Sequence, residues 1–164
     1  MKRACCVLML AMALVMSTAA VAYAYYYPTY TDNATSSKTT GVYIHGYAKA
    51  HVATDLHCYG YASTTSHKAS NDAVVNVPWM SVSLTLSGQY INNSPSWPAG
   101  WYHTFSHQVS ASGKNTDFVD VSDDFVPPNL PYSATAYASG VHSFKSSLNG
   151  LTYVCKTKTA GAGK

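Results

Sequence analysis

A long stretch in which small or apolar residues alternate with polar ones constrains the fold of this chain more than any other feature. Between residues 42 and 64 one set of alternate positions includes Ile44, Ala48 and Val52, whereas Tyr, His and Lys occupy most of the positions between them. Successive side chains of a strand point to opposite faces of a sheet, so a period of two predicts β-structure with one buried face. The stretch is longer than a normal strand, and we expect a bend or bulge near residues 53–55 to divide it in two.

The same alternation returns in several later segments. They cover residues 79–86, 101–111, 118–121, 132–144 and 151–157. Gly, Pro, Asn and Ser cluster between them, as is typical of turns, and we find no convincing helix. The pattern predicts an all-β domain over residues 42–159, built as an antiparallel β-sandwich of about six to eight strands. Small residues on an early and a late segment, such as Gly46 and Ala136, indicate that two faces approach closely.

Composition supports a folded β-domain and argues against one class of partner. After residue 24 the chain has no Glu and no Arg, and its charges are eight Lys against seven Asp. Nucleic-acid binding needs a concentrated basic face, which this balance does not supply. Abundant β-branched and aromatic residues, with few long unbranched helix formers, favour strands. We therefore expect a β-domain with no nucleic-acid partner.

The first 24 residues have the pattern of a secretory signal peptide. Lys2 and Arg3 precede an uncharged apolar run, and small residues at Ala22 and Ala24 suit a signal peptidase. We expect cleavage near Ala24 and an extracellular, secreted product. The alternative is an uncleaved anchor, because residues 4–27 are uncharged and about 20 apolar residues can span a bilayer. Membrane contact is expected only through this segment.

The two ends of the remaining chain lack any apolar period. Residues 25–41 begin with a run of Tyr and continue into a Thr- and Ser-rich stretch. We expect them to form a flexible leader. Residues 160–164 are Ala, Gly and Lys, and we expect a disordered tail.

Two cysteines, Cys58 and Cys155, remain after the predicted cleavage. An isolated pair in an oxidising compartment predicts a disulfide. The loop that it closes would contribute roughly 4–5 kcal/mol in the chain-entropy account. The alternative is metal ligation together with His57, although structural zinc commonly uses cysteines in closely spaced pairs and the chain has no second pair.

Aromatic residues around one Pro- and Gly-containing loop form the candidate ligand site. Trp97, Trp101 and Tyr102 could stack on the apolar faces of a sugar or anchor an interface. The alternative is that a tryptophan such as Trp101 or Trp79 belongs to the core.

Four of the seven acids lie within eight residues and form the candidate metal site. They are Asp117, Asp120, Asp123 and Asp124. Closely spaced carboxylates can hold calcium, although the run does not match the calcium-loop pattern. The alternative is a solvated acidic turn. No other cofactor is expected.

The sequence indicates a protein that acts through its surface and not through catalysis. Glu is absent, and the chain contains none of the common hydrolase, zinc-protease or phosphate-loop motifs. We expect a non-catalytic extracellular structural or interaction protein, or a module that binds cell-wall polysaccharide or another extracellular surface. The alternative is a secreted antimicrobial or toxin-like protein. Self-association is also expected, because strand edges with few charges are poorly protected against pairing.

Overall fold

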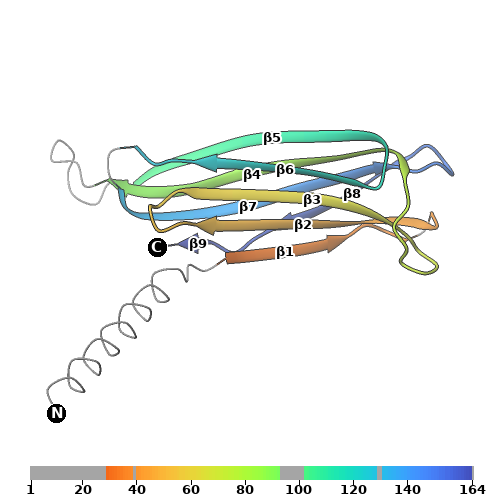
Figure 1. Ribbon diagram of the computed structural model, residues 1–164, viewed down its shortest axis with the longest axis horizontal. Coiled ribbons are helices and arrows are strands. Elements are labelled where there is room, and N and C mark those ends of the chain that lie inside the picture. The colour runs from red at the N-terminus through yellow and green to blue at the C-terminus, as the bar shows by residue number, and fades with distance from the viewer. Residues whose placement is uncertain (1–28, 39, 93–101, 129–130, 164) are drawn as a thin grey trace, which may run out of the picture.

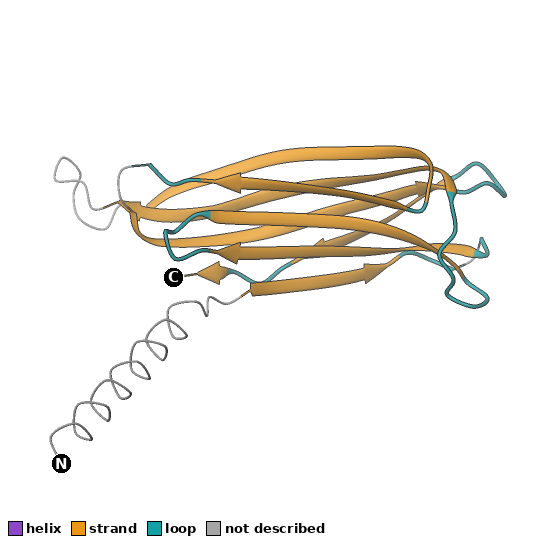
Figure 2. Ribbon diagram, in the orientation of Figure 1, coloured by secondary structure: helices purple, strands orange, loops and turns teal. Residues whose placement is uncertain are grey.

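The computed structural model describes residues 29–38, 40–92, 102–128 and 131–163, and the predicted signal segment lies outside them. These residues form strands and no helix (Figure 2). The strands are β1 (Thr29–Thr35), β2 (Val42–Val52), β3 (Cys58–Lys68), β4 (Val77–Asn92), β5 (Tyr102–Thr116), β6 (Phe118–Phe125), β7 (Pro131–Lys145), β8 (Thr152–Lys158) and β9 (Ala162–Gly163). The all-β prediction is confirmed.

The strands form two antiparallel sheets. Sheet A has the order β1-β2-β3-β6, and sheet B has the order β5-β4-β7-β8 with β9 added beside β7 (Figure 1). The chain completes β1 to β3 of sheet A, crosses to sheet B for β4 and β5, returns for β6 and then finishes sheet B. One edge of sheet A is tied to sheet B where the Lys158 backbone N–H donates to the Asp32 carboxylate at 2.7 Å.

A tight reversal divides the long alternating stretch, as predicted near residues 53–55. The Ala53 N–H donates to the His57 carbonyl at 2.8 Å, and the Leu56 N–H donates to the Ala53 carbonyl at 3.0 Å. Leu56 has a φ of 66°, in the left-handed region, which lets the chain turn back sharply. β2 and β3 then pair along their whole length, from Val52 opposite Cys58 onward.

The core lies between the inner faces of the two sheets. Its largest fully buried apolar side chains are Phe144, Ile44, Met80, Leu84, Leu86, Val52 and Val82. β2 lies against β7 across the layers, and Gly46 and Ala136 are both buried there. A Cβ at Gly46 would overlap the ring of His142 on β7. The close approach indicated by the small residues is therefore confirmed.

Both chain ends differ from expectation, because each adds a strand. β1 lies within the supposed flexible leader and pairs with β2 from Thr29 opposite His51 to Thr35 opposite His45. β9 lies within the supposed disordered tail and pairs Ala162 with Ala136. Backbone groups along a sheet need hydrogen-bond partners, and an added edge strand can supply them without an apolar period of its own. The described residues therefore form nine strands instead of the six to eight expected.

The cysteine prediction also needs correction, since Cys58 and Cys155 are free and buried. The Cys155 residue on β8 lies opposite His142 of β7, and the His142 ring contacts Thr64 of β3. Thr64 is six residues along β3 from Cys58, about 20 Å at the usual strand rise. A disulfide requires Cα atoms within about 7 Å, so the two thiols are too far apart to bond.

We expect both thiols to react with a maleimide only after denaturation. Burial raises the pKa of the Cys58 thiol, and that of the Cys155 thiol, to about 11, which suppresses the reactive thiolate. The measurement is mass spectrometry of a chain that begins at residue 25, after labelling without reductant, with and without denaturant. Two added labels in denaturant fit the free thiols, whereas no label in denaturant would show that a disulfide exists after all.

Candidate functional site

A shallow groove lies on the outer face of sheet A, on the side away from the core. Its volume is about 700 Å³. It is lined by Tyr47, Lys49 and His51 of β2, by Tyr59, Gly60 and Tyr61 of β3, and by Ser122, Asp123 and Asp124 of β6. We call the surface formed by this set of residues the groove.

The period of two in β2 and β3 places these side chains outside. Ala48, Ala50 and Ala62 are fully buried, so the residues between them on each strand face away from sheet B. The pairing of β2, β3 and β6 then aligns the outward side chains in rows across the sheet. Two adjacent rows are His51, Tyr59 and Asp124, and Lys49, Tyr61 and Ser122. Each central tyrosine is therefore flanked on both sides by a side chain that is able to donate or accept a hydrogen bond.

The aromatic rings of the groove remain partly open to solvent. Tyr59 keeps 40% of its surface exposed, and its ring lies 6.2 Å from that of His51 at an interplanar angle of 27°. Tyr47 and Tyr61 meet edge to face, with centroids 6.1 Å apart. The groove thus combines aromatic surface with flanking polar groups, an arrangement that can contact a ring with one apolar face and polar edges.

Two groups in the groove have shifted pKa values that favour their neutral forms. Partial burial, and then the charge of Lys49, lowers the pKa of His51. Partial burial raises the pKa of Tyr61, with a further contribution from Asp120 and an opposing hydrogen bond from Ser63. At neutral pH the groove therefore offers a neutral imidazole and a protonated phenol, both able to exchange hydrogen bonds with an uncharged ligand.

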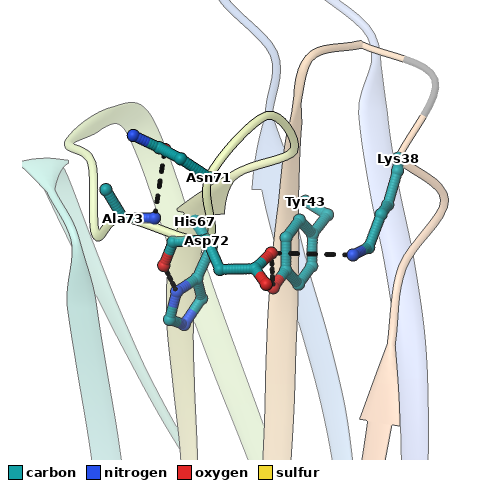
Figure 3. Close-up of polar contacts among 6 residues, drawn as sticks. All are labelled: Lys38, Tyr43, His67, Asn71, Asp72 and Ala73. Carbon is teal, nitrogen blue, oxygen red and sulfur yellow. Dashed lines mark hydrogen bonds and ion pairs between the residues drawn. The ribbon is translucent and has the colours of Figure 1, made fainter.

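The turn between β3 and β4 folds over the opposite end of the same face (Figure 3). The Tyr43 hydroxyl donates to an Asp72 carboxylate oxygen at 2.9 Å, and Lys38 approaches that oxygen at 3.7 Å. The Lys38 ammonium also lies 4.3 Å from the Tyr43 ring centroid, while the ring stacks on His67. Tyr43 is only 9% exposed although it points outward, so this turn covers that end of the face.

Asp123 differs from its neighbours on β6 because it points inward. Its Oδ2 lies 3.5 Å from His107 Nδ1 of β5, is buried and accepts no hydrogen bond. The ring of Phe125 stacks on that of Phe105 at 4.1 Å beside this pair. Asp123 thus links the two sheets, and Asp124 is the acid that faces outward along the groove.

The structure describes only some of the predicted site residues. Trp97 and Trp101 lie outside the described residues, and Tyr102 is 67% exposed at the start of β5 in sheet B. Of the four acids, Asp117 lies in the turn before β6, two face outward along that strand, and Asp123 faces inward. In the part of the chain that the structure describes, no three His, Cys or Asp side chains could hold a metal ion.

The groove could not be identified from the sequence alone. The alternation assigns Tyr47, Tyr59 and Tyr61 to an outward face, and that signal was available. The pairing of β3 with β6 was not, because it joins residues about 60 positions apart in the chain. Without it, nothing placed Asp124 beside Tyr59.

Comparison with known proteins found no family model, curated protein or solved structure that matches this chain. Among the described residues there is no helix with the length and apolar character needed to cross a membrane.

Proposed function

We propose that this chain is a secreted, non-catalytic protein whose groove binds an uncharged stretch of extracellular or cell-wall polysaccharide. The two packed sheets are consistent with a β-sandwich that serves as a rigid support for this face. The observation that carries the proposal is the pair of rows in which Tyr59 and Tyr61 are each flanked by hydrogen-bonding side chains.

The chemistry of a sugar ring fits these rows. A pyranose has apolar C–H faces and hydroxyls around its edge, so a ring stacked on Tyr59 would place hydroxyls toward His51 and Asp124. Stacking supplies contact area at little conformational cost, and the flanking groups fix orientation. The strands also hold the tyrosines before any ligand arrives, which lowers the entropy lost on binding.

Removal of one groove ring should abolish most of the binding. We expect Tyr59→Ala to weaken retention on insoluble chitin or cellulose by about tenfold or more, the size typical of a central aromatic contact. Tyr30→Ala is the matched control, because Tyr30 is also 40% exposed but lies on β1 outside the groove. The measurement is co-sedimentation of the purified secreted form over a range of polysaccharide concentrations.

Three outcomes would contradict the proposal. The wild-type protein could fail to sediment with either polysaccharide, Tyr59→Ala could bind as well as wild type, or Tyr30→Ala could lose as much. A toxin-like role would instead appear as arrested growth of cells or leakage of vesicles at low protein concentration.

A further inference from the structure

The acids of the described residues are absent from the strands of one sheet. Asp32, Asp120, Asp123 and Asp124 lie on strands of sheet A, Asp55 lies in the turn between β2 and β3, and Asp72 and Asp117 lie in turns that connect sheet A to sheet B. The strands of sheet B contain no acid and four lysines: Lys114, Lys145, Lys156 and Lys158. Sheet B therefore presents a positive field on the side of the molecule opposite the groove.

Two of these lysines flank a tryptophan. Trp79 of β4 pairs with Lys114 of β5 on one side and with Lys145 of β7 on the other. Met80 and Phe144, the neighbours along their strands, are fully buried, so the row of three points outward. We call these three residues the Lys-Trp-Lys row. Side chains directly opposite in such pairs have Cβ atoms about 5 Å apart, which places both ammonium groups within reach of the indole.

The groups of this row are not engaged by the protein itself. Both lysines are exposed, and neither forms an ion pair with any described residue. The Trp79 ring is only partly buried, and within the described ranges no aromatic ring stacks on it and no cation covers it. A partly buried indole between two exposed ammonium groups that form no ion pair can still contact a ligand through both its ring and the two charges.

The surface beside the row is rich in hydroxyls. The next row along the strands is Ser112, Ser81 and Ser143, and the one after it begins with Ser110 and Ser83. Ser83 Oγ accepts hydrogen bonds from Ser110 Oγ at 2.9 Å and Gln108 Nε2 at 3.0 Å. These groups extend the polar surface available to a long ligand without adding a negative charge.

We propose that the Lys-Trp-Lys row is a binding site for an anionic polysaccharide. One sugar ring stacks on Trp79, and acidic groups on that ring and its neighbours bind Lys114 and Lys145. Charge complementarity selects this ligand class, because an acid-free face repels no polyanion and charge-assisted hydrogen bonds to lysine are stronger than neutral ones. The site is separate from the groove, so the protein could join a charged polymer on one side to an uncharged one on the other.

The test is affinity electrophoresis of the purified secreted form in native gels. The gels contain polygalacturonate or dextran sulfate, and the neutral counterparts are methyl-esterified polygalacturonate and dextran. We expect retardation by the anionic polymers alone, and weaker retardation at high salt because ions screen exposed charges. Equal retardation by each anionic polymer and its neutral counterpart would overturn the proposal.

Single charge removals locate the site. We expect Lys114→Gln and Lys145→Gln each to weaken polymer binding by about tenfold, as for loss of one charge-assisted contact. Lys68→Gln removes the same charge from an exposed position on β3 of sheet A, and it should bind as wild type. An equal loss of polymer affinity in all three variants would show that binding depends only on net charge, and it would contradict a site at the Lys-Trp-Lys row.

Two further readouts separate this site from the groove and from a contact between two copies of the chain. Tyr59→Ala should retain full binding to the anionic polymers, so failure of the groove proposal leaves this one testable. The competing hypothesis is that sheet A of a second copy of the chain, which carries acids on its strands, covers the Lys-Trp-Lys row. Concentration-dependent dimers that Lys114→Gln abolishes, with no binding to either anionic polymer, would assign the row to that contact instead.

Discussion

Acidification from pH 7 to pH 4 is expected to lower the free energy of unfolding by about 3 kcal/mol through His142 alone. His142 is fully buried between the sheets. Its Nδ1 is hydrogen-bonded to Thr64 Oγ1 and its Nε2 to Thr157 Oγ1, both at 2.9 Å. Burial, and then the nearby His45, lowers the pKa of His142 to about 4.

The direction of the pH effect follows from the two protonation states. In the unfolded chain His142 binds a proton near its ordinary pKa of about 6.5, whereas the folded protein resists that proton until about pH 4. The contribution of His142 is therefore fully present above about pH 6.5 and is lost as the pH falls to 4. The loss levels off about one pH unit below the folded pKa.

Denaturant unfolding of the wild type and of His142→Gln at pH 7 and pH 4 measures this effect. Glutamine can keep hydrogen bonds to the two threonines but does not titrate. We expect the variant to be less stable at pH 7 and to lose about 3 kcal/mol less than the wild type on acidification. An equal acid-dependent loss in both proteins would contradict the assignment to His142.

Phe144→Ala is expected to reduce the free energy of unfolding by about 3–5 kcal/mol, the usual cost of removing a buried phenylalanine ring. Phe144 is fully buried on β7, pairs with Met80 of β4 and stacks on Tyr153 at a centroid distance of 5.4 Å. Removal of the ring leaves a cavity between the two sheets. Strand pairing holds the sheets in place, so they cannot move together freely to fill the cavity.

The control lies on the neighbouring strand. Val154 of β8 is 50% exposed on the outer face of sheet B, and we expect Val154→Ala to change stability by less than about 0.5 kcal/mol. Denaturant unfolding at pH 7 compares the two variants. Similar losses in both would show that the Phe144 ring does not occupy the packed interior described above.

The strands and their buried faces could be predicted because they depend on local alternation. Ile44 and Val52 on β2, and Leu84 on β4, are buried as their positions in the pattern require. Exclusion of apolar side chains from water selects one face of a strand wherever the alternation is regular. The bend near residues 53–55 was predictable for a related reason, since no ordinary strand is long enough to span the whole stretch.

Features that depend on long-range pairing could not be predicted in this way. β1 is polar and lacks an apolar period, and it is held by the edge of β2. The two cysteines suggested a disulfide because the sequence does not show which strands lie side by side. In the fold Cys155 lies opposite His142, which contacts Thr64, and Thr64 is six residues along β3 from Cys58. The groove needs β6 beside β3, and the Lys-Trp-Lys row needs β5 and β7 on either side of β4. Strand order, which local patterns do not encode, determines each of these sites.

Ring-resolved NMR during titration with chitohexaose tests the groove most directly. We expect concentration-dependent shifts for the ring signals of Tyr59 and Tyr61, while those of Tyr30 stay unchanged. A neutral oligosaccharide should also leave the indole signal of Trp79 in place, because that row is proposed to select charge. Absence of shifts at Tyr59 and Tyr61, or shifts confined to residues of sheet B, would contradict the groove as the binding surface.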